Sequence, residues 1–257
     1  MTATTITQRA QGRLRLYNGV MGAFHLAQAV VVLALATEFT LPVFATFMSG
    51  PPGVGEPTVT HLFDASLAWG VAGFLLLSAA AHAVLVLPGV FGWYTGNLAK
   101  GRNYARWIEY SVSSTLMVLL IALLTGIGDV AALVGLGAAN AGMILFGLLM
   151  EHYESPGRPR WLSYNFGVLV GAAPWAAIAI YLWSPGVAAE PPAFVYAIFF
   201  SLFAFFNAFA VNMVLQYRRV GPWRSYLFGE STYILLSLTA KSALAWQVFG
   251  ATLAPTG

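Results

Sequence analysis

The chain has 257 residues, of which 59% are hydrophobic and only 8% are charged. Soluble domains carry about 25% charged residues, so this composition excludes a water-soluble core and indicates a membrane protein. The sequence contains no cysteine, which excludes disulfides and thiolate metal sites, and its net charge of +3 is too small and scattered for a nucleic-acid-binding protein.

Seven apolar stretches are each long enough to cross a bilayer as a helix, which takes about 20 residues. Helices are expected because a backbone in lipid must satisfy its own hydrogen bonds, and barrel strands would alternate in polarity. We therefore predict an all-α bundle of seven transmembrane helices in a single domain, 1–257. The predicted spans are about 14–36, 62–87, 103–125, 130–150, 162–183, 193–216 and 225–250. The longer connection 37–61 alternates apolar and polar residues, which favours a small β-hairpin outside the membrane.

The positive charges are distributed asymmetrically between the two sides of the predicted bundle. Every Lys and Arg except Lys241 lies before the first helix or in the second, fourth or sixth connection, counting Arg106 at the inner start of its helix. The other connections contain acidic residues but no Lys or Arg. The positive-inside rule therefore predicts a multi-pass protein of the cell membrane with its N-terminus in the cytoplasm and its C-terminus outside.

Lys241 is the exception, because it lies within the last apolar stretch, roughly 14 Å from the outer helix end. An ionised lysine at that depth costs at least about 2.5 kcal/mol, so it needs a carboxylate partner, a water cavity or covalent conversion. One interpretation is a structural ion pair inside the bundle. The other is a Schiff base, since a desolvated lysine amine reacts with aldehydes.

Glu109 is the best candidate for an anion beside Lys241. It lies about one turn inside the predicted helix 103–125, with Ser113 one turn further along the same face and Arg106 nearly one turn earlier. Side chains lean toward the N-terminus of their helix, and helix 225–250 starts on the inside. We therefore expect Lys241 to face Glu109 toward the cytoplasmic side.

Two motifs then resemble a known family. The run 106–111 reads Arg-Trp-Ile-Glu-Tyr-Ser, and the run 237–246 reads Ser-Leu-Thr-Ala-Lys-Ser-Ala-Leu-Ala-Trp. With seven spans and an inside N-terminus, they look like the heliorhodopsins, retinal proteins inverted relative to ordinary microbial rhodopsins, and the likeness covers essentially the whole chain. The resemblance implies all-trans-retinal on Lys241 as a protonated Schiff base, Glu109 as its counterion, and Ser237 hydrogen-bonded at the Schiff base.

The expected function is a light-absorbing photoreceptor with sensory or regulatory output, without ion pumping and without enzymatic activity. Pumping rhodopsins usually carry a second carboxylate where Ser237 stands, and the outer half of helix 103–125 contains no obvious carboxylate to reprotonate the base. Two alternatives stay open: a light-driven ion transporter, and a non-retinal protein in which Lys241 and Glu109 form a structural pair. No metal cluster, nucleophile elbow or phosphate loop is present in the sequence.

Polar residues on the cytoplasmic half suggest a closed cavity that accepts a proton. A lone membrane histidine is often only an interhelical hydrogen bonder, but two histidines on adjacent helices suit such a cavity better, and heliorhodopsins have one. The predicted cavity and acceptor residues are His25, Gln28, Ser78, His82, Asn103, Arg106, Trp107, Asn140 and Glu151. Glu230 lies about three turns before Lys241 on the same face, and its role is left open.

The chromophore pocket is predicted largely from the resemblance. The aromatic residues of the predicted helix 193–216 are distributed around its whole circumference, so core packing is the default interpretation for most of them. Besides Ser113, the pocket candidates are Phe203, Phe206, Met143, Gly147, Pro174 and Trp175. The expected partners are membrane lipid, a second copy of the chain contacted through the long first loop, as in heliorhodopsin dimers, and an unidentified cytoplasmic signalling protein.

Overall fold

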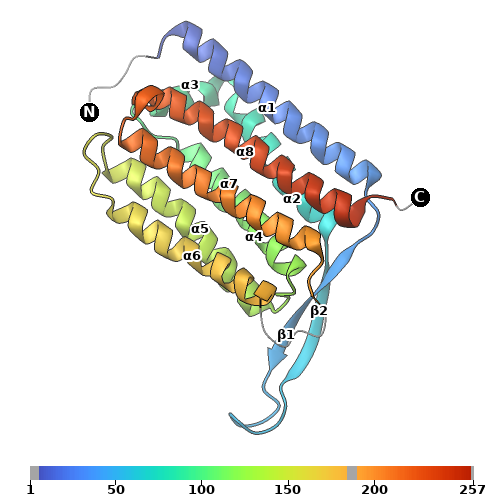
Figure 1. The fold of residues 1–257 in the computed structure, drawn as a ribbon. Helices are drawn as coiled ribbons and strands as arrows, with labels where there is room; N and C mark the ends of the chain where they lie inside the picture. The colour runs from blue at the N-terminus through green and yellow to red at the C-terminus, as the bar shows by residue number, and fades with distance from the viewer. Residues whose placement is uncertain (1–5, 184–189, 256–257) are drawn as a thin grey trace.

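The computed structural model describes residues 6–183 and 190–255, and these contain seven helices long and apolar enough to span a membrane. They pack side by side into one bundle (Figure 1). The seven are α1 (Gln8–Leu35), α2 (Leu67–Leu85), α4 (Tyr104–Leu124), α5 (Val130–Tyr153), α6 (Leu162–Trp183), α7 (Ala193–Tyr217) and α8 (Tyr226–Val248). The last helix continues into the π-helical turn η2 (Phe249–Leu253). The prediction of a seven-helix membrane bundle is confirmed.

The first long connection forms the predicted hairpin, with strand β1 (Thr40–Phe47) antiparallel to β2 (Thr58–Ser66). It projects beyond one end of the bundle, and α1 begins at the opposite end (Figure 1). The N–H of Phe44 donates to the carbonyl of Gly128 at 3.0 Å, which ties β1 to the connection between α4 and α5. Helix α2 therefore starts at Leu67 and not at the predicted Leu62, because the intervening residues pair with β1.

Two short helices occupy connections at the other end of the bundle. Helix α3 (Pro88–Leu98) follows α2, and the 3-10 turn η1 (Gly221–Arg224) precedes α8. The sequence prediction extended the second span to residue 87 and left 88–102 as a connection, so it missed α3. Proline at the first position favours a helix start, and Tyr94 and Leu98 are buried beneath the helix. Tertiary burial therefore stabilises a helix whose glycines give it little intrinsic propensity.

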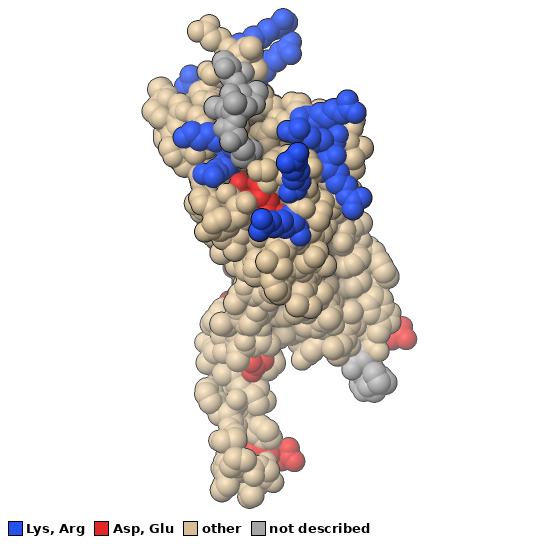
Figure 2. Space-filling view, turned by 90° about the vertical axis from the view of Figure 1, so that its left-hand side faces the viewer, with Lys and Arg blue, Asp and Glu red and all other residues tan. Residues whose placement is uncertain are grey.

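Lys and Arg side chains gather at the end of the molecule away from the hairpin (Figure 2). Among the described residues, Lys241 and Arg106 depart from this surface distribution, since both are buried at 3% and 6% exposure. The arrangement agrees with the charge asymmetry in the sequence. It separates a basic end of the bundle, where α3 and η1 lie, from the end that carries the hairpin.

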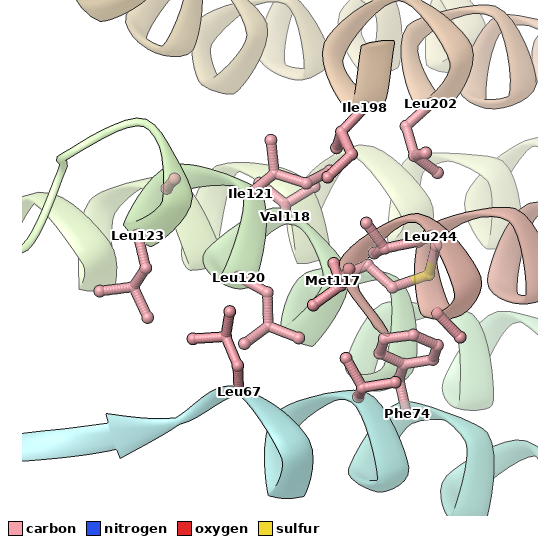
Figure 3. Close-up of a cluster of buried hydrophobic side chains, with 14 of the residues drawn as sticks. Leu67, Phe74, Met117, Val118, Leu120, Ile121, Leu123, Ile198, Leu202 and Leu244 are labelled. Atoms are coloured by element: carbon pink, nitrogen blue, oxygen red, sulfur yellow. The ribbon is translucent and has the colours of Figure 1, made fainter. Parts of the chain in front are cut away.

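An apolar core fills the part of the bundle between Lys241 and the hairpin end. Figure 3 shows side chains from α2, α4, α7 and α8 meeting there, including Phe74, Met117, Ile198 and Leu244. Each of these four is at most 2% exposed. Because Lys241 lies on the basic side of this core, the packed hydrophobic residues separate it from the hairpin end.

Candidate functional site

The ammonium group of Lys241 is held among three oxygen-bearing side chains inside the bundle. Its Nζ lies 2.8 Å from Oε1 of Glu109 on α4 and 3.1 Å from Oγ of Ser237, one turn earlier on α8. Nζ also donates to Ser78 on α2, whose hydroxyl in turn donates to Glu109 at 2.6 Å. The side chains of Lys241 and Glu109 are 4% and 10% exposed. Three helices thus supply a buried, charge-balanced site, and Glu109 stands where the sequence placed it.

A cavity of about 130 Å³ adjoins the amine of Lys241 on its apolar side. Its wall comes from α4, α5, α6, α7 and α8, and it is mostly hydrocarbon and aromatic. The hydroxyl of Ser113 reaches this wall and is a buried polar atom without a hydrogen-bond partner among the described residues. Six predicted pocket residues line the cavity: Ser113, Met143, Gly147, Phe206, Ser237 and Lys241.

The shape of this cavity depends on two glycines. A Cβ built on Gly147 would overlap the ring of Trp107, and one built on Gly171 would overlap the side chain of Met143. Both contacting side chains, Trp107 and Met143, belong to the cavity wall. Glycine at these positions therefore lets Trp107 of α4 pack against α5 and Met143 of α5 pack against α6, because a larger residue would push these side chains into the cavity.

A smaller polar cavity of about 40 Å³ lies on the basic side of Glu109. Nδ1 of His82 donates to Oδ1 of Asn18 on α1 at 2.9 Å, and the His82 ring stacks on that of His25 with 5.8 Å between centroids. Both ring nitrogens of His25 lack a hydrogen-bond partner among the described residues. The lining includes Asn18, Ser78, His82, Asn103, Arg106 and Glu109. The two predicted histidines are therefore neighbours, and His82 borders the same space as the predicted counterion.

Arg106 also lines the polar cavity. Its guanidinium donates to Glu151 on α5 and to Glu230 on α8, and both pairs are buried. Glu151 further accepts from the backbone N–H of Asn103 at 2.9 Å and from Nε1 of Trp107 at 2.7 Å. The predicted cavity residues Asn103, Arg106, Trp107 and Glu151 thus form one network. Glu230, whose role the sequence left open, is the additional member.

The chain was compared with known protein families and structures. The family model described as Heliorhodopsin matches residues 14–253, which is nearly the whole chain. The chain belongs to the heliorhodopsin family. It is therefore a retinal-binding, multi-pass membrane photoreceptor, and the family consists of light-sensing retinal proteins, not classical enzymes. The resemblance inferred from the two helix motifs is confirmed.

Solved structures show the same architecture at low sequence identity. The crystal structure of cyanorhodopsin from the cyanobacterium Tolypothrix sp. NIES-4075 matches with a TM-score of 0.60 and 15% identity, covering 96% of each chain. At this identity the likeness establishes the rhodopsin fold alone. No curated protein matches the chain.

The remaining predicted residues of this heliorhodopsin lie away from the two cavities. The ring of Trp175 packs on those of Phe203 and Phe206 at 5.3 Å between centroids, so Trp175 and Phe203 stand behind the wall that Phe206 forms. Pro174, the neighbour of Trp175 on α6, is buried but also lies outside the lining of the larger cavity.

Two predicted members of the polar cavity face other helices. Gln28 accepts from Nε1 of Trp246 at 3.0 Å, between α1 and α8. Asn140 donates to Ser114 at 2.9 Å and to Thr115 at 3.0 Å on α4. A polar residue in an apolar run signals a hydrogen bond between helices, but the run does not show toward which helix the residue turns.

Sequence reasoning missed two residues of the site, Asn18 and Tyr110. Asn18 pairs with His82, and Tyr110 donates to the carbonyl of Tyr233 at 2.8 Å while Nζ of Lys241 lies 5.3 Å from its ring centroid. Tyr110 stands next to Glu109 inside the motif 106–111, so its position in the motif was an available signal. For Asn18 the signal was an amide side chain in an apolar helix, about two turns before His25.

Proposed function

We propose that Lys241 carries all-trans-retinal as a protonated Schiff base and that Glu109 is the counterion of this group. The supporting observation is the position of Nζ, which lies at the end of an apolar cavity and 2.8 Å from a buried carboxylate. When bound there, retinal supplies light absorption and the energy of its photoisomerisation. The apolar wall fits a hydrocarbon chromophore, since binding sites for such ligands are mostly apolar with a few placed polar groups.

The side chains around Nζ hold its proton on the side that faces the basic end of the bundle. Glu109 stabilises the charged nitrogen, while the hydroxyls of Ser78 and Ser237 fix the direction of its hydrogen bonds. After light absorption, we propose that the proton at Nζ moves toward Glu109 and the polar cavity behind it. His82, which borders that cavity and stacks on His25, is the proposed acceptor there, because a neutral imidazole has one ring nitrogen with a free lone pair that can bind a proton.

The proposed output is sensory or regulatory, without transport of an ion. An ion pump needs a polar route from the Schiff base to both faces of the membrane. On the hairpin side, Met117, Ile121 and Leu244 belong to a packed apolar core and are each at most 2% exposed. A light-driven proton transporter is the alternative, and transport measurements decide between the two.

We further propose the orientation and assembly of the protein in the cell membrane. The basic end, at which α1 begins, faces the cytoplasm according to the positive-inside rule, and the hairpin faces outside. The hairpin bears exposed apolar side chains such as Phe47 and Phe63, at 55% and 54% exposure, and is the proposed contact between two copies. A soluble signalling protein would meet the basic end.

The chain offers a sharp test of the attachment site, because its only two lysines are Lys241 and Lys100. Lys100 is exposed at the basic end and serves as the matched control. All-trans-retinal added to the apoprotein is expected to give a visible band in the parent and in Lys100→Ala, and none in Lys241→Ala. Reduction with borohydride followed by peptide mapping is expected to place the label on Lys241. A visible band in Lys241→Ala, or a label on Lys100 alone, contradicts the proposal.

A further inference from the structure

Glu230 is a buried carboxyl group that the proposed light reaction does not use. It lies in the first turns of α8 and is 1% exposed. One nitrogen of Arg106 donates to it, and the other donates to Glu151. We refer to Arg106, Glu151 and Glu230 as the Arg106 cluster.

The charges of the Arg106 cluster do not balance if both carboxyl groups are ionised. A guanidinium keeps its charge in proteins, so the cluster would consist of one cation and two anions and carry one excess negative charge. Lys241 does not compensate it, because Lys241 is already paired with Glu109 at 2.8 Å. A buried charge without a partner is strongly unfavourable, and the usual outcome is neutralisation by a proton.

Among the residues that the structure describes, the groups that surround the cluster supply no second cation. The titratable neighbours that act on Glu230 or Glu151 are tyrosines, which are uncharged at neutral pH. His82, which lines the same polar cavity as Arg106, hydrogen-bonds to Asn18 and to neither carboxyl group of the cluster. The tyrosines are Tyr94 on α3, Tyr110 on α4, Tyr217 on α7, and Tyr226 and Tyr233 on α8. The described surroundings therefore leave the excess negative charge of the cluster without a compensating cation.

The hydrogen bonds distinguish the two carboxyl groups. Glu151 accepts from four donors, which are Arg106, the backbone N–H of Asn103, Nε1 of Trp107 and the hydroxyl of Tyr226. Glu230 accepts from only two, Arg106 and the amide of Asn103 at 2.7 Å. Each donated hydrogen bond favours the ionised form of a carboxyl group. Glu151 is therefore the carboxylate, and Glu230 is the group that binds the proton.

We propose that the Arg106 cluster is a proton-binding site that holds one proton, on the carboxyl of Glu230, in the dark at neutral pH. Glu109, the partner of Lys241, and Arg106 of the cluster both line the polar cavity of about 40 Å³, so the two sites border one space. A change of charge at Glu109 then acts on the cluster through Arg106. That coupling to light rests on the proposed function, whereas the dark proton does not.

Infrared spectroscopy of the dark protein at neutral pH tests the proposal, because a protonated carboxylic acid has a carbonyl stretch that a carboxylate lacks. The parent is expected to show this band, and it should shift when the protein is transferred to heavy water. Glu230→Gln is expected to lose the band because the acid is gone. Glu151→Gln is expected to lose it as well, because a single remaining carboxyl balances Arg106 without a proton. The exposed Glu38→Gln is the control and should keep the band.

The experiment separates this proposal from the assignment of the chromophore. Variants are compared only where they form the parent's helical circular dichroism, and the parent spectrum alone already decides whether a buried acid exists. Absence of the band from the parent, or its survival in either Glu230→Gln or Glu151→Gln, overturns the proposal. A failure of Lys241 to bind retinal would leave the dark band unchanged and would count against the proposed function alone.

Discussion

Replacement of Gly147 by alanine probes the packing that joins the chromophore cavity to the Arg106 cluster. The added Cβ would overlap the ring of Trp107. That ring is held in place, because its Nε1 donates to Glu151 at 2.7 Å and the guanidinium carbon of Arg106 lies 4.3 Å from its centroid. Trp107 is also 5% exposed, so little free space surrounds it.

The size of the effect follows from three contributions. Overpacking a core position costs about 2 kcal/mol. Displacing Trp107 loses a hydrogen bond to a charged acceptor, which is worth about 2 kcal/mol. Alanine gains about 1 kcal/mol over glycine in helix propensity. The net expectation for Gly147→Ala is a destabilisation of about 3 kcal/mol.

Gly135 supplies the matched control on the same helix, since no atom lies within 4 Å of a Cβ built there. Gly135→Ala should gain about 1 kcal/mol from propensity alone. The two variants then differ by about 4 kcal/mol, or roughly 8–16 °C in Tm at about 2–4 °C per kcal/mol. Thermal melting in detergent, followed by circular dichroism, measures the difference. Equal melting temperatures for Gly147→Ala and Gly135→Ala would refute the packing of Trp107 against Gly147.

Two further substitutions test the neighbourhood of Lys241. Glu109→Gln removes the anion 2.8 Å from Nζ and should change the wavelength of the visible band, whereas the exposed Glu38→Gln should not; an unchanged spectrum would remove Glu109 as counterion. Gly22→Ala brings a Cβ to 2.9 Å from Cβ of His82. The overlap should cost about 1–2 kcal/mol and lower Tm by roughly 2–8 °C. Gly19→Ala, whose Cβ would have no atom within 4 Å, should not lower Tm. A Gly22→Ala variant as stable as Gly19→Ala would contradict the close contact of α1 with α2.

Because the chain contains few charged residues, much of the candidate site could be predicted from the sequence. In a chain with 8% charged residues, a lysine inside an apolar run stands out, and the need to neutralise it points to the few carboxylates at similar depth. Helix periodicity then gives the faces of Glu109, Ser113 and Ser237. The seven spans follow from length and hydrophobicity alone, because the bilayer fixes both.

The parts that sequence reasoning missed depend on contacts between distant segments. Helix α3 is stabilised by burial of Tyr94 and Leu98, and its exposed glycines hide that signal. The residues from Leu62 to Ser66 are apolar enough for a helix, but strand pairing with β1 takes precedence. Glu230 joins Arg106 across the bundle, and no local pattern on α8 reveals a partner on α4.

Transport measurements distinguish a proton that moves from Lys241 into a closed polar cavity from one that crosses the membrane. The measurement is the external pH of illuminated vesicles that contain the protein and show its visible band, with and without a protonophore. If the proton stays in the polar cavity, light produces no pH change that the protonophore abolishes. A protonophore-sensitive pH change in the parent protein would contradict it and would identify the chain as a light-driven proton transporter.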